Sequence, residues 1–195
     1  MIRTRWAAMM SIALLGTSMA LPGFAQQKDS AAQIAAAVLP LPEAMRSGAT
    51  VVSIDKGVET VLRKGSNGMV CRDYSSNQVF QANCFHETIY AITKRTDELS
   101  KSLNGKALED AVEKEIQSGK LKAPPVPSMG FQIRGPLAGY DAATHTVSKD
   151  VKVWQMVIIP HATGASLGLP EQPPGNNMPW VMGAGTLIAH IMVEH

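Results

Sequence analysis

The sequence is poor in cysteine and has no long apolar run after its first 25 residues. Its only cysteines are Cys71 and Cys84, and they lack the Cys-x-x-Cys spacing of redox enzymes. A zinc site would need two further ligands close by, and His86 offers one. No later stretch approaches the roughly 18 apolar residues that a membrane helix requires, so no integral span is expected after residue 25.

The first residues hold the one long apolar run. Arg3 and Arg5 give a positive start, residues 6–21 are mostly apolar, and Pro22 and the small Ala25 follow. This order is typical of a secretory signal peptide. The run is also short and interrupted for a membrane span.

We therefore predict a signal peptide over residues 1–25, cleaved near Ala25, with Ala20 as the alternative site. The remainder, residues 26–195, is long enough to bury a core and is expected to form a single domain. The predicted location of this domain is periplasmic or extracellular.

An excess of charge of either sign is also absent from residues 26–195. The whole chain has 18 basic and 16 acidic residues, and Arg3 and Arg5 belong to the predicted signal segment. Proteins that bind nucleic acid or anionic membranes need clustered Lys and Arg. The balance argues against both, and leaves a small molecule or another protein as the expected partner.

The two cysteines are expected to form a disulfide, because paired cysteines oxidise in an export compartment. Closing the short loop between Cys71 and Cys84 contributes on the order of 3 kcal/mol. A redox pair and a metal site remain as alternatives.

Apolar periodicity predicts an α+β fold with antiparallel strands at both ends of a single domain and a central helical hairpin. The first three strands are expected to form an antiparallel meander. A long irregular loop over residues 161–179 is rich in Pro and Gly, and such loops often carry function. The expected strands are 49–54, 58–62, 69–72, 129–134, 151–159, 180–182 and 187–193, and the expected helices are 30–38, 86–103 and 106–118.

Several stretches of the sequence resemble stretches of other proteins. They are residues 48–52, residues 61–68 followed by Cys71, then Cys84, and residues 179–186 running into 190–192. In these stretches the chain resembles a family of uncharacterised secreted bacterial proteins, and it departs from them in its charged helical middle. The resemblance implies export, a disulfide and one domain. It supplies no catalytic residue.

One motif points to an enzyme. Residues 164–168 match the Gly-x-Ser-x-Gly nucleophile elbow around Ser166 and follow a predicted strand. An acid, Glu171, and a histidine, His190, come later in the chain. However, residues 169–174 contain three prolines, which do not build the helix that follows an elbow. A secreted hydrolase using Ser166 and His190 is the alternative function, and a flexible loop of small residues is the structural interpretation.

Soft ligands gather late in the chain, although no cofactor is predicted. Imidazole and thioether groups suit copper, so His161, His190 and Met182 form a hypothetical metal site. The structural interpretation is that these methionines fill the core, since Met packs well into irregular interiors.

Ligand binding is the remaining interpretation of the C-terminal third. Trp180 lies at the edge of loop 161–179 and offers a ring for stacking, with His161 at the other end of that loop. The sequence therefore favours a non-catalytic binding or envelope-associated module, with Trp180 and His161 as candidate ligand contacts.

Overall fold

The computed structural model describes residues 30–124, 127–175 and 177–194. The predicted signal peptide, residues 1–25, lies outside them. Among the described residues, no helix is long and apolar enough to cross a membrane.

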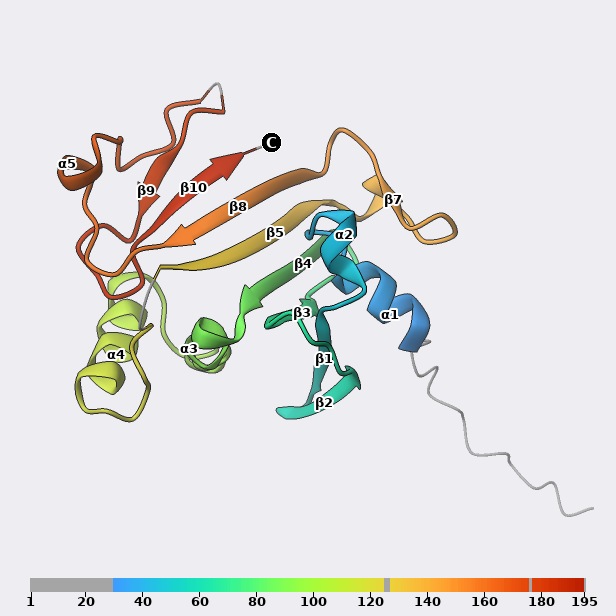
Figure 1. Ribbon diagram of the computed structural model, residues 1–195, viewed down its shortest axis with the longest axis horizontal. Coiled ribbons are helices and arrows are strands. Elements are labelled where there is room, and N and C mark those ends of the chain that lie inside the picture. The colour runs from blue at the N-terminus through green and yellow to red at the C-terminus, as the bar shows by residue number, and fades with distance from the viewer. Residues whose placement is uncertain (1–29, 125–126, 176, 195) are drawn as a thin grey trace, which may run out of the picture.

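The described chain combines helices with one large sheet and one small sheet, which is the predicted α+β class (Figure 1). The helices are α1 (Ser30–Ala37), α2 (Glu43–Arg46), α3 (Glu87–Leu99), α4 (Gly105–Gln117), α5 (Gly164–Leu167) and a 3-10 turn at Leu137–Gly139. The strands are β1 (Thr50–Asp55), β2 (Val58–Arg63), β3 (Met69–Asp73), β4 (Val79–His86), β5 (Ser128–Pro136), β6 (Tyr140–Asp141), β7 (Thr146–Val147), β8 (Lys152–Ile158), β9 (Trp180–Met182) and β10 (His190–Glu194).

The large sheet has eight strands in the order β2-β1-β3-β4-β5-β8-β10-β9, and it is mixed. β1 pairs antiparallel with β2 and parallel with β3, so the predicted antiparallel meander is wrong at the third strand. The turn after β2 explains this order. The backbone N–H groups of Ser66 and Asn67 both donate to the carbonyl of Gly48, at 2.7 and 3.1 Å. This contact carries the chain past the start of β1, and β3 then runs along the far side of β1.

A strand that the pattern analysis missed, β4, lies at the centre of the sheet between β3 and β5. Its neighbouring residues point to opposite faces. Cys84 packs with α1, and its Sγ lies 3.4 Å from the carbonyl oxygen of Ala37. Phe85 packs instead with Ile89 of α3. The helices α1 and α3 therefore cover opposite faces of the sheet.

The predicted disulfide joins Cys71 of β3 to Cys84 of β4, with an S–S distance of 2.03 Å. Both residues are fully buried beneath α1. The disulfide thus lies in the core of one face of the sheet.

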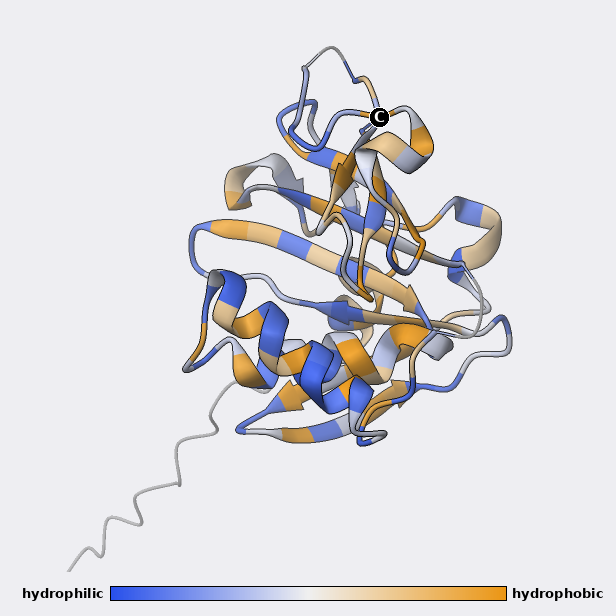
Figure 2. Ribbon diagram, turned by 90° about the vertical axis from the view of Figure 1, so that its left-hand side faces the viewer, coloured by the Kyte–Doolittle hydropathy of each residue, from blue (hydrophilic) through white to orange (hydrophobic). Residues whose placement is uncertain are grey.

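On the other face, α3 packs against α4. Hydrophobic and hydrophilic residues alternate along both helices, as the colouring in Figure 2 shows. Ile92 contacts Val112 and Ile116 in a separate apolar cluster, and Arg95 forms two hydrogen bonds with Glu115. The two helices therefore form one layer over this face.

Candidate functional site

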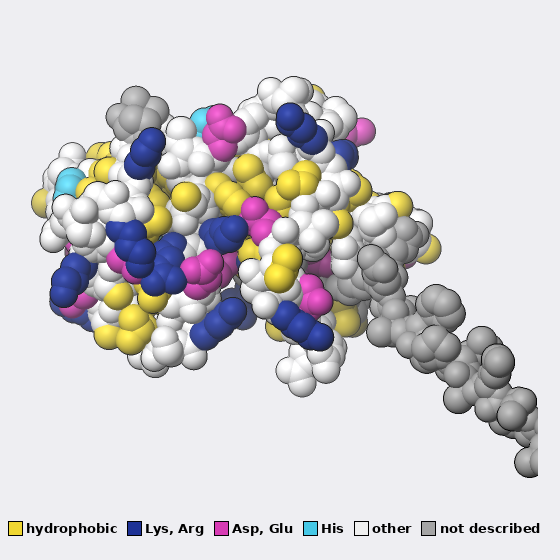
Figure 3. Space-filling model, turned by 90° about the horizontal axis from the view of Figure 1, so that it is seen from below, with side chains coloured by type: hydrophobic (Ala, Val, Ile, Leu, Met, Phe, Trp, Pro, Cys, Tyr) yellow, Lys and Arg dark blue, Asp and Glu magenta, His cyan; other side chains and the backbone are white. Residues whose placement is uncertain are grey.

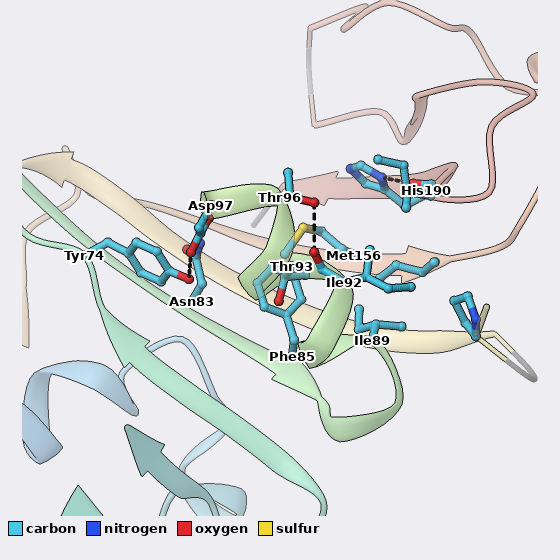
Figure 4. Close-up of a pocket in the computed structure, with 13 residues that line it drawn as sticks. Tyr74, Asn83, Phe85, Ile89, Ile92, Thr93, Thr96, Asp97, Met156 and His190 are labelled. Atoms are coloured by element: carbon cyan, nitrogen blue, oxygen red, sulfur yellow. Dashed lines mark hydrogen bonds between the residues drawn. The ribbon is translucent and has the colours of Figure 1, made fainter. Parts of the chain in front are cut away.

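A cavity of about 210 Å³ lies between α3 and the sheet. It separates two apolar clusters, one built on Met156 and Ile158 and the other on Val112 and Ile116. Figure 4 shows the lining side chains converging from α3 and from several strands. The apolar lining is Phe85, Ile89, Ile92, Pro124, Met156, Ile158 and Ile188, and the polar lining is Tyr74, Asn83, Thr93, Thr96, Asp97 and His190.

One wall of the cavity is a single face of α3. Ile89, Ile92, Thr93 and Thr96 follow the i, i+3, i+4, i+7 spacing that places side chains on one stripe of a helix. The helix begins at a fixed point, because the His86 ring accepts a hydrogen bond from the backbone N–H of Thr88.

The opposite wall comes from alternating positions of the sheet. Gly130 of β5 lies opposite Phe85 of β4 on one side and Met156 of β8 on the other. A Cβ at Gly130 would lie 2.9 to 3.0 Å from atoms of those two side chains. Because Gly130 has no side chain, the side chains of Phe85 and Met156 fill this space and form the wall.

The end of the cavity near β3 is closed by a charged cluster. The Tyr74 hydroxyl donates to Asp97 at 2.7 Å, and Arg72 donates to the same carboxylate oxygen at 2.9 Å. The Arg72 guanidinium also lies 4.1 Å from the centre of the Tyr74 ring. Burial, followed by the charge of Asp97, raises the pKa of Tyr74. At this end the positive charge of Arg72 offsets the negative charge of Asp97, and Tyr74 is protonated.

The opposite end carries His190. Its Nδ1 lies 2.9 Å from the carbonyl oxygen of Ile188, and since a carbonyl only accepts, Nδ1 carries the proton. Burial lowers the pKa of His190 despite that hydrogen bond. The ring is therefore neutral at pH 7, with the lone pair on Nε2.

The hydroxyl groups of the two threonines that line the cavity from α3 already donate hydrogen bonds to the protein. Thr93 donates to the carbonyl of Tyr90 at 2.9 Å, and Thr96 donates to that of Ile92 at 2.9 Å. Such bonds to the preceding turn leave the oxygen lone pairs exposed. The cavity therefore presents mainly apolar surface with a few hydrogen-bond acceptors.

Ser166, the predicted nucleophile, lies in the first turn of α5, where it forms a capping box with Thr163. Its Oγ accepts from the Thr163 N–H and donates to the Thr163 carbonyl, each at 2.9 Å. Glu171 accepts from the N–H of Gly164 at 2.7 Å. Among the hydrogen bonds of the described residues, none joins Ser166 to His190, so the hydrolase remains a prediction from the motif alone.

The structure brings together two of the three hypothetical copper ligands. Met182 of β9 lies directly opposite His190 of β10, and Met182 is 46% exposed. His161 is exposed, and its Nδ1 lies 3.3 Å from the carbonyl of Gly185. In the described part of the chain, no group of three or more His, Cys, Asp or Glu side chains could hold a metal ion.

The two predicted ligand contacts lie apart from the cavity lining. Trp180 is 8% exposed and packs in the same apolar cluster as Met156 and Ile158, and it lines a separate pocket together with Pro173 and Met178 of the loop. His161 lies at the surface. Sequence reasoning identified the apolar stripe of α3 but missed its role. Thr93 and Thr96 also lie in that stripe and line the cavity, but a stripe alone does not show whether the space opposite is filled.

The chain was compared with protein-family models, curated proteins and solved structures, and none of them matched.

Proposed function

We propose that the protein is an exported binding module that holds a small, largely apolar molecule in the cavity between α3 and the sheet. The apolar lining of the cavity carries this proposal. The space measures about 210 Å³, and seven of its thirteen lining residues are apolar. Its walls are apolar and its polar groups are few, which is the usual composition of a small-molecule site.

The volume sets the size of the group that the cavity can hold. A dry apolar cavity of roughly 150 Å³ takes up benzene, and typical drug-sized pockets begin at about 300 Å³. A cavity of about 210 Å³ therefore suits one substituted ring or a short chain.

The surface around the site offers no large patch of one charge. Figure 3 shows basic and acidic side chains intermixed on the face seen from below. Several of them are paired, as Arg95 is with Glu115 and Lys94 with Glu59. This mixture supports a small uncharged ligand better than a polyanion.

Export is supported by the signal-peptide pattern of residues 1–25 and by the disulfide, which suits an oxidising compartment. Membership of the secreted bacterial family is proposed on the resemblance of residues 48–52, 61–68 and 179–186. The native product should begin near residue 26 and be recovered outside the cytoplasm. A native product that begins at Met1 and fractionates with the cytosol would contradict this.

Binding is tested with 1,4-dimethylbenzene, followed by methyl NMR of the folded protein. We expect saturable shifts of the methyl groups of Ile89, Ile92 and Met156, which line the cavity. Val51, buried on the opposite face under α1, should not shift. The absence of saturable shifts at the lining methyls would overturn the binding function.

A filled cavity provides the matched control. In Thr96→Trp, a large ring occupies the space, and the hydroxyl that is lost contacts only its own helix. This variant should lose the shifts. Ala107→Trp, at an exposed position of α4, adds the same ring elsewhere and should keep them.

A further inference from the structure

Most hydrogen-bond donors around the cavity are used inside the protein. Each of four lining side chains donates its hydrogen to a protein oxygen and so keeps only acceptor capacity toward the cavity. The donors are Tyr74 to Asp97, Thr93 to Tyr90, Thr96 to Ile92, and His190 to Ile188.

The strongest of these acceptors is Nε2 of His190. The proton on Nδ1 is fixed by the carbonyl of Ile188, 2.9 Å away, and a neutral imidazole with one protonated nitrogen accepts at the other. No hydrogen bond between described residues uses Nε2. The ring lines the cavity wall, and Figure 4 shows it across from Thr96 and Met156.

One donor remains, at the opposite end of the cavity. The side-chain oxygen of Asn83 accepts from Gln132 at 3.2 Å, which leaves the Asn83 amide N–H groups available. However, β4 and β10 are separated by β5 and β8, a distance of about 14 Å at roughly 4.8 Å per strand. Asn83 therefore does not serve a group placed beside His190.

We infer that the cavity selects an uncharged alcohol, phenol or N–H compound whose donor hydrogen is accepted by Nε2 of His190, an inference that rests on the proposed binding function. The ring or chain of the ligand lies against Ile89, Ile92 and Met156. His190 is thus a specificity-determining residue.

Anionic ligands are disfavoured by the same arrangement. Arg72, a cation beside the cavity, is paired with Asp97 at 2.9 Å, and Asp97 is the charged group among the described lining residues. A buried carboxylate ligand would face acceptor atoms and a carboxylate, without a cation to compensate its lost hydration.

The test compares three probes of similar size on the folded protein: 4-methylphenol, 1,4-dimethylbenzene and 4-methylbenzoate. The first two differ by a hydroxyl in place of a methyl group. We expect 4-methylphenol to bind about threefold more tightly than 1,4-dimethylbenzene, because the buried hydrogen bond gains more than the loss of one methyl contact costs. We expect 4-methylbenzoate to bind most weakly of the three.

Variants of His190 test whether this residue causes the preference for 4-methylphenol. In His190→Phe the preference for 4-methylphenol should vanish while 1,4-dimethylbenzene still binds. His190→Gln, which restores an acceptor oxygen, should recover part of the preference. His161→Phe replaces an exposed histidine outside the lining and should leave all three affinities unchanged.

Imidazole nitrogen NMR on the unmodified protein provides a test that does not depend on a variant folding. Adding 4-methylphenol should shift the Nε2 resonance of His190 and leave Nδ1 nearly unchanged. If no probe binds, the binding function itself fails. If the two neutral probes bind equally, if the carboxylate binds best, or if Nε2 does not shift, the cavity binds ligand but the inference about His190 is wrong.

Discussion

Cys71 and Cys84 lie directly opposite each other on the antiparallel strands β3 and β4, with Cα atoms 4.0 Å apart. The bond closes a loop of 13 residues in sequence separation. It also lies under α1 and the turn that follows, where Ala37 and Leu41 pack in the same apolar cluster as the two cysteines. It therefore joins the first half of the sheet to its centre, inside a fully packed core.

Removing this bond should lower the free energy of unfolding substantially. For a loop of this length, the lost restriction of the unfolded chain corresponds to about 3 kcal/mol. We expect the double variant Cys71→Ala/Cys84→Ala to show that loss in urea unfolding. As a control, adding a reductant should leave the double variant unchanged. An unfolding free energy within about 0.5 kcal/mol of the parent would contradict a stabilising role.

The glycine at position 65 allows a close backbone approach between two segments. A Cβ there would overlap the backbone of Gly48, Ala49 and Thr50, at the point where the chain crosses the start of β1. Gly65→Ala should therefore destabilise the protein by several kcal/mol or prevent it from folding. At Gly48 the atoms nearest to a Cβ would be those of the Asn67 side chain, at 3.1 to 3.4 Å. Gly48→Ala is the control and should cost much less in a thermal unfolding comparison.

That crossing also explains which part of the fold the sequence could not predict. Alternation located the strands near β1, β2 and β3, because burial of one face leaves a local pattern. The order of the strands depends on the hydrogen bonds from Ser66 and Asn67 to the carbonyl of Gly48. These bonds join separate segments of the chain, and a local apolar pattern does not record them. Strand β4 was missed although Gln81 and Asn83 alternate with Phe80, Ala82 and Cys84, which is the pattern of a half-buried strand.

Acid should destabilise the packing of α3 against α4 by protonating Glu115. Arg95 forms two hydrogen bonds with Glu115, at 2.8 and 2.9 Å. Together with Lys120, they lower the pKa of Glu115 from 4.5 to about 2. A carboxyl whose folded pKa is depressed stabilises the fold above its unfolded pKa, and this contribution is lost as the pH falls through the folded pKa. The stability from Glu115 is therefore present above about pH 4.5 and disappears toward pH 2.

Glu115→Gln should lower the thermal midpoint at pH 7, and the gap to the parent should narrow from about pH 4.5 downward. Carbon NMR of the Glu115 carboxyl provides a direct check, with a midpoint expected near 2. The pair of Lys106 and Asp110 has side chains 81% and 62% exposed, so Asp110→Asn should change little. A gap for Glu115→Gln that is constant with pH would refute this role.

The candidate site was only partly predictable for a related reason. The stripe of Ile89 and Ile92 indicated a helix face that covers the sheet, and the structure places it there. A stripe does not tell whether the space opposite is filled, since that depends on facing residues such as Gly130 and Phe85. The tautomer of His190 likewise depends on Ile188 being held in place by the turn before β10.

Ser166 should act as a helix cap and not as a nucleophile. Its hydroxyl donates to the Thr163 carbonyl and accepts from the Thr163 N–H, which occupies it on both sides. We expect a serine-directed fluorophosphonate to leave the folded protein unlabelled, as judged by intact mass. Ser166→Ala and Thr163→Ala should each cost about 0.5–1 kcal/mol, and together less than their sum, because each removes part of the same capping box. Labelling at Ser166 that Ser166→Ala abolishes would instead favour the hydrolase.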